Sequence, residues 1–101
     1  MILTIENDTR VWTGTITANL DTINANRFAK EMQPLLENAD KEIILDCSRM
    51  EYICSSGLRQ LLTLRKEVGA KGGRLTIVHI NDDVRHIFQI TGFFQLFDIR
   101  D

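Results

Sequence analysis

The chain has 101 residues, 44% of them hydrophobic and 26% charged, a size that suits one domain with one core, and we predict a single domain over residues 1–101. The formal net charge is −2, and Lys and Arg are scattered along the chain, which argues against nucleic acid as the main ligand. No stretch approaches the roughly 18 apolar residues of a membrane span, and the first six residues do not resemble a signal peptide, so we expect a cytoplasmic protein without a membrane span.

The first third of the chain predicts a β-hairpin followed by a helix. Apolar and polar residues alternate over residues 2–6 and again over 9–18, with the turn residues Asn7 and Asp8 between them. Asp21 and Thr22 are favourable N-cap residues for the helix. An apolar stripe at helical spacing follows, made of Ala25, Phe28, Ala29, Met32, Leu35 and Leu36. Pro34 would cost about 3 kcal/mol inside a helix, so we expect a kink there.

The middle of the chain predicts a strand and a second helix. Ile43-Ile44-Leu45 is a continuous apolar run, which indicates a central strand that is covered on both faces. The second helix is expected over residues 57–68 and ends at the glycines 69, 72 and 73. Helical spacing places five residues on one side of it: Leu58, Leu61, Leu62, Arg65 and Val68.

The last third predicts a strand over residues 75–80, then a third helix capped by Asn81 or Asp82 and ended by Gly92. The apolar tail over residues 93–97 is expected to close the core. The element order is then ββαβαβα, which predicts an α/β fold: a mixed β-sheet of about four strands, flanked by helices, with right-handed crossovers.

The chemistry of the chain is concentrated in residues 54–58, between the central strand and the second helix. The free backbone amides and partial positive charge of a helix start favour an anion such as phosphate, and a serine there is a plausible phosphoacceptor. The alternative is that Ser55 or Ser56 only caps the helix.

Residues 44–48 (ILDCS), 52–58 (YICSSGL), 72–75 (GGRL) and 84–93 (VRHIFQITGF), with Leu20-Asp21 before the first helix, resemble the STAS family. This family is named for sulfate transporters and anti-sigma-factor antagonists. The resemblance implies a STAS-like fold and a partner-switching regulator of transcription. Such a regulator sequesters an anti-sigma factor that has serine-kinase activity. Phosphorylation of the regulator's signature serine ends this binding, and a phosphatase would reverse that step.

The same resemblance assigns roles to individual residues. Ser56 aligns with the phosphorylated serine. The surface that contacts the partner is expected to comprise Asp21, Thr22, Ser55, Ser56, Gly57, Leu58 and Arg59. The resemblance implies no catalytic residue and no cofactor. Neither His79 nor His86 lies at a zinc-finger-like spacing from the cysteines, so no metal is expected.

The chain departs from the family pattern at Cys54, where Asp is usual, and at Arg59, where a small residue is usual and a guanidinium could pair with phosphate on Ser56. The loss of the Asp favours one alternative, a soluble STAS subunit that docks on a membrane transporter's ATPase without phosphorylation. Another alternative is a small thiol or serine enzyme using Cys54 or Ser56, but no histidine has an evident partner geometry. Cys47 and Cys54 are interpreted as reduced thiols.

Overall fold

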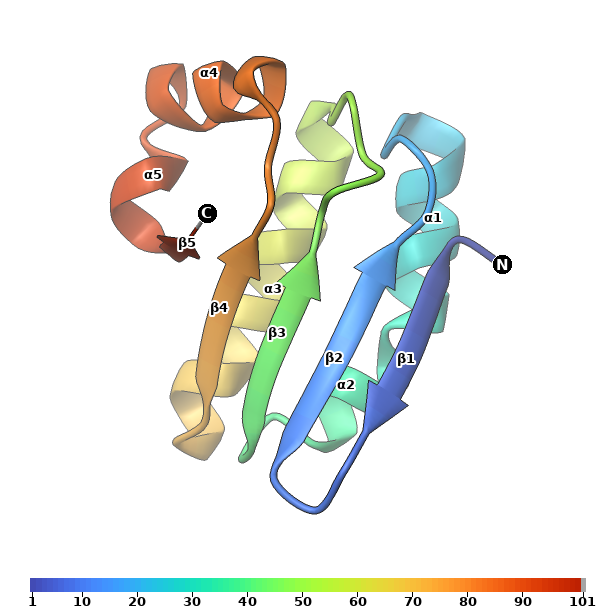
Figure 1. Cartoon of the computed structure of the whole chain (residues 1–101), viewed down its shortest axis with the longest axis vertical. Helices are drawn as coiled ribbons and strands as arrows, with labels where there is room; N and C mark the ends of the chain where they lie inside the picture. Colours follow the sequence, from blue (N-terminus) through green and yellow to red (C-terminus); the bar gives the residue numbers. More distant parts are fainter. Residues whose placement is uncertain (101) are drawn as a thin grey trace.

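The computed structural model describes residues 1–100, which form one five-stranded sheet and five helices (Figure 1). The elements follow in the order β1 (Leu3–Asn7), β2 (Val11–Ile16), α1 (Thr22–Glu31), α2 (Gln33–Glu37), β3 (Glu42–Asp46), α3 (Ser55–Lys71), β4 (Arg74–Val78), α4 (Asp82–Ile90), α5 (Phe93–Leu96) and β5 (Asp98–Arg100). β1 and β2 form the predicted antiparallel hairpin, whereas β2, β3, β4 and β5 pair in parallel. The predicted mixed α/β sheet is confirmed.

The sheet has five strands where the sequence predicted about four, because β5 was missed. β5 is only three residues long and carries a charge at both ends, so it has neither the length nor the apolar pattern of a strand. Its carboxylate at Asp98 lies 3.6 Å from the guanidinium of Arg74 at the start of β4. Backbone pairing with β4 therefore defines this strand, and that pairing has no local signature.

The first predicted helix is divided in two at Met32. The carboxylate of Asp21 caps α1 by accepting a hydrogen bond from the backbone N–H of Asn24 at 2.8 Å. Pro34 lies in the first turn of α2, where the missing N–H of proline costs no helical hydrogen bond. The expected kink is confirmed and takes the form of a break between two helices.

The second predicted helix, α3, starts at Ser55 and not at Gly57, so both serines belong to its first turn. Gly72 ends it with φ of 78°, as the glycine signal predicted. The buried face is rotated from the side that the sequence spacing picked out, since Leu62 is half-buried, Arg65 is exposed and Leu64 is fully buried. The Arg65 guanidinium stays near solvent and donates from Nε to the Leu96 carbonyl at 2.6 Å.

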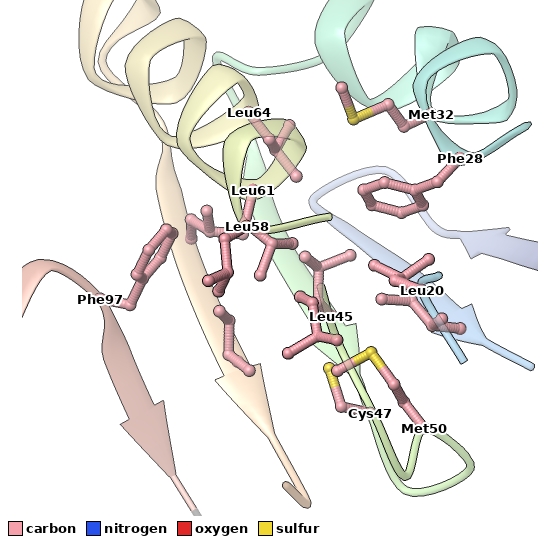
Figure 2. Close-up of a cluster of buried hydrophobic side chains, with 14 of the residues drawn as sticks. Leu20, Phe28, Met32, Leu45, Cys47, Met50, Leu58, Leu61, Leu64 and Phe97 are labelled. Carbon is pink, nitrogen blue, oxygen red and sulfur yellow. The ribbon is translucent and has the colours of Figure 1, made fainter. Parts of the chain in front are cut away.

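The helices α1, α2 and α3 all lie behind the sheet in Figure 1, which looks onto a sheet face that these helices do not cover. Ile43 and Leu45 of β3 are fully buried on the helix side, while Ile44 points to the other face and is only half-buried. The prediction that this strand is covered on both faces is therefore wrong for the chain by itself. The side chains between helices and sheet form the core shown in Figure 2.

The C-terminal segment closes the core, as predicted. Asn81 caps α4 through its side-chain oxygen, which accepts from the Val84 N–H at 2.8 Å, and Gly92 has φ of 79°. The rings of Phe88, Phe93 and Phe97 lie with centroids 5.7 to 6.4 Å apart, within the range of favourable aromatic contacts.

Candidate functional site

Two loops meet where β2 and β3 end, near the top of Figure 1. One leads from β2 into α1, and the other leads from β3 into α3. They are joined by a parallel bridge between Leu20 and Ile53. The Leu20 N–H donates to the Tyr52 carbonyl at 3.0 Å, and the Cys54 N–H donates to the Leu20 carbonyl at 2.8 Å. This pairing brings the start of α1 beside the start of α3.

Asn19 strengthens the junction and was not singled out from the sequence. Its side-chain oxygen accepts from the backbone N–H groups of Glu51 at 2.7 Å and Tyr52 at 3.1 Å. Its own carbonyl accepts from the Asn24 side chain at 2.9 Å. Asn19 bonds to residues more than 30 positions away, so only its residue type, which favours loops, could have drawn attention to it.

The serine pair lies on the first turn of α3, directly after Cys54 as N-cap residue. Ser55 is exposed, whereas Ser56 is half-buried with its Oγ 3.4 Å from the Cys54 Sγ. Ser56 is therefore partly accessible to solvent and not fully buried in the core. Its surroundings match the sequence expectation of a hydroxyl at a helix start near the ends of the strands.

Gly57 and Leu58 are buried and contribute to packing inside the fold, so they are not available for contact with a partner protein. A Cβ on Gly57 would lie 2.8 Å from Ile53 Cγ1 and 2.9 Å from Leu20 Cβ, so only glycine allows α3 to approach the joined loops. Leu58 is 8% exposed and points into the core, beside Leu61 (Figure 2). Of the residues predicted to contact a partner, Asp21, Thr22, Ser55 and Arg59 are exposed and Ser56 is half-buried.

Two large apolar side chains at the joined loops are exposed. Ile23, in the first turn of α1, is 69% exposed, and Tyr52, directly before the Ile53 bridge, is 49% exposed. Single exposed apolar residues are common, but two on the joined loops give this surface an apolar character. We call Ile23, Tyr52, Ser55, Ser56 and Arg59 the switch surface.

The two cysteines are both free thiols and differ sharply in acidity. Burial, with a smaller effect from Asp46, raises the pKa of Cys47 to about 12. Partial burial also disfavours the Cys54 thiolate, but hydrogen bonds from the Ser56 hydroxyl, the Gly57 and Ser56 amides and the Thr22 hydroxyl lower the pKa of Cys54 overall.

Native protein is expected to be alkylated at Cys54 alone, with a reaction rate that reaches half its maximum below the pH typical of a free thiol. Ser56→Ala removes one hydrogen bond to the thiolate, so it should move this midpoint to higher pH. Iodoacetamide labelling across a pH series, followed by mass spectrometry, measures both effects. A Cys54 midpoint equal to that of a small free thiol would contradict the lowered pKa.

A family model described as the STAS domain matches residues 3–101. The chain belongs to the STAS domain family. The resemblance seen in the signature residues is thus confirmed across the described fold.

Named relatives of this STAS domain are anti-sigma factor antagonists. The chain is 29% identical over 80 residues to BtrV of Bordetella bronchiseptica, provisionally named an anti-sigma factor antagonist, and the match covers 79% of this chain and 69% of BtrV. The fold matches a similarly named crystal structure from Thermotoga maritima with a TM-score of 0.88 at 24% identity, over 98% of this chain and 86% of the other.

The fold also matches the anti-sigma factor antagonist SpoIIAA, which is described as a Bacillus cell fate determinant. Its unphosphorylated form gives a TM-score of 0.73 at 20% identity, over 98% of this chain and 87% of the other. Its phosphorylated form gives 0.71 at 20% identity, over 96% and 89%. Within residues 1–100 of the STAS domain described here, no helix is both long and apolar enough to cross a bilayer.

Proposed function

We propose that this STAS domain is a binding protein of a cytoplasmic partner-switching system and not an enzyme. When Ser56 carries no phosphate, the switch surface binds an anti-sigma factor with serine-kinase activity and so frees a sigma factor. Phosphate on Ser56 ends this binding until a phosphatase removes it. The proposal is supported by the anti-sigma factor antagonist names of BtrV and SpoIIAA and by the existence of a phosphorylated form of SpoIIAA.

The observation that carries the proposal is the placement of Ser56. Ser56 is half-buried in the first turn of the 17-residue helix α3, and the exposed Ile23 and Tyr52 lie at the two loops whose pairing joins the starts of α1 and α3. Phosphate adds about −1.5 to −2 charge and three acceptor oxygens at neutral pH. A partner that packs apolar groups against this surface would have to bury that charge, which is costly.

Phosphorylation by the cognate kinase tests the assignment of Ser56. Incubation with kinase and ATP is expected to add one phosphate to the wild-type chain and to Ser55→Ala, and none to Ser56→Ala, as read by intact mass. The two serines are neighbours on the same helical turn, so Ser55→Ala is a matched control. Loss of the phosphate in Ser55→Ala alone would move the acceptor to Ser55.

Ile23 should anchor the partner. Ile23→Asp is expected to weaken binding of the anti-sigma factor at least about tenfold, since it removes an exposed apolar contact and adds charge to the switch surface. Ile90→Asp is the matched control, because Ile90 on α4 is also 69% exposed but lies outside the switch surface. Titration calorimetry of both variants measures the difference, and equal affinities would place the partner elsewhere.

Cys54 supports a second candidate function. The usual carboxylate before the serine pair is replaced by a thiol at the N-cap of α3, which removes an anionic group from the site of phosphorylation. A STAS subunit that docks on a transporter's ATPase needs no phosphate on Ser56. Capture of a transporter ATPase by both wild type and Ser56→Asp would favour this second function.

A further inference from the structure

One face of the sheet carries no cover from α1, α2 or α3, although four of its five strands are parallel (Figure 1). Parallel sheets are almost always covered on both faces, because their strands carry apolar residues on both sides. The strand register places one continuous row across this open face, made of Glu6, Thr13, Ile44, Thr76 and Asp98. The centre of this row is half-buried Ile44 and Thr76, which is 8% exposed.

Charges on the open face are divided between its two halves. Alternation along the strands places the carboxylates of Glu6, Glu42 and Asp46 on this face, all on β1 and β3. The other half, on β4 and β5, carries the guanidinium groups of Arg74 and Arg100. Asp98 lies between these two arginines and pairs with both, at 3.6 Å and 3.0 Å.

We propose that the open face is covered by a second copy of this chain, sheet against sheet, in a twofold-symmetric dimer. A twofold axis along the strands, between β3 and β4, sets β3 of each copy over β4 of the other. Glu42 of each copy then faces Arg74 of the other, and Ile44 faces Thr76. The Glu42–Arg74 pair is formed twice under this symmetry, so the centre of the face is complementary to itself, which is the requirement for an isologous interface.

The size of the face predicts how strong this dimer is. Because the axis lies between β3 and β4, β2 to β5 of the two copies overlap and β1 lies outside the contact. Four strands at about 4.8 Å spacing and five residues at about 3.3 Å rise give a patch of about 19 by 17 Å. The contact is therefore smaller than the standard-size interfaces of stable complexes and has the size of a weak, transient one. The dimer should therefore be weak and its formation should depend on protein concentration. It does not depend on the proposed function, since the face lies on the opposite side of the sheet from α3.

Charge reversal on two separate chains tests the proposal. Wild type is expected to shift from monomer to dimer as concentration rises in sedimentation equilibrium. Glu42→Arg alone and Arg74→Glu alone should each weaken self-association about tenfold or more, because like charges then face each other twice. An equimolar mixture of the two variants should associate as strongly as wild type, because both facing pairs are again opposite in charge.

The mixture of the two variants shows whether the loss of self-association comes from contacts between chains or from repulsion within one chain. Glu42 and Arg74 are also cross-strand neighbours in the same sheet, and each single variant leaves that internal pair with like charges, which mixing does not repair. Both side chains are exposed, so the variants should remain folded, which circular dichroism checks. A wild-type chain that stays monomeric at every concentration overturns the proposal, and so does a mixture that associates no better than its components.

Discussion

Ser56→Asp is expected to lower the affinity for the anti-sigma factor about a hundredfold, while Ser56→Ala binds as wild type does. A carboxylate at this half-buried position must lose water when the partner packs against the switch surface. A hundredfold loss corresponds to about 2.7 kcal/mol, which is within the range for one uncompensated charge at an interface. Titration calorimetry with the purified partner measures the affinity of each variant.

Ser55→Asp is the control for this result. It adds the same charge one residue earlier on the switch surface, at an exposed position where a carboxylate loses less water than at half-buried Ser56, so its effect on binding should be smaller. Both substitutions place an acidic residue in the first turn of α3, which should stabilise the helix by about 0.3 to 1 kcal/mol, so reduced binding cannot be attributed to unfolding. An equal loss in Ser55→Asp would show a general charge effect and contradict a switch specific to Ser56.

Gly73→Ala should destabilise the fold by more than about 3 kcal/mol. A Cβ at Gly73 would lie 2.1 Å from the Ala39 carbonyl oxygen and 2.5 Å from that of Lys41, so backbone must move to admit it. These carbonyls belong to the segment that leads into β3, and the Arg74 N–H donates to the Lys41 carbonyl at 3.2 Å. The methyl group would therefore disturb the start of both β3 and β4. Urea unfolding followed by circular dichroism measures the change.

Gly69→Ala is the matched control and should have the opposite sign. Gly69 lies inside α3, and a methyl group added there would have nothing within 4 Å, while alanine is favoured over glycine in a helix by about 0.5 to 1 kcal/mol. The same chemical change is thus expected to stabilise one site and disrupt the other. A Gly73→Ala protein as stable as wild type would mean that the close backbone approach is not required.

Local signals in the sequence predicted the parts of the fold that local chemistry decides. The caps at Asp21 and Asn81 and the left-handed glycines at 72 and 92 depend on residues within one turn, and all were found. β5 was missed because only pairing with a distant strand makes it a strand. The prediction that Ile44 is covered by another part of the chain was wrong. An apolar run shows that a side chain favours burial, but it does not show which segment or molecule buries it.

The candidate site was predictable to a similar degree. The signature residues indicated Ser56 and the turn that holds it, and the structure places that turn at the surface. Asn19 and the exposure of Ile23 could not be inferred, since both depend on how two loops more than 30 residues apart come together. That Gly57 is needed for close packing followed only once Leu20 and Ile53 were placed beside it.

The junction of the two loops is made largely of main-chain hydrogen bonds between residues 20 and 52–54. Such bonds tolerate most changes of side chain, so the outward-facing residues around Ser56 are free to diverge without displacing the hydroxyl. Partner specificity could therefore change by substitution of these outward-facing side chains, while the proposed phosphoacceptor keeps its position at the start of α3.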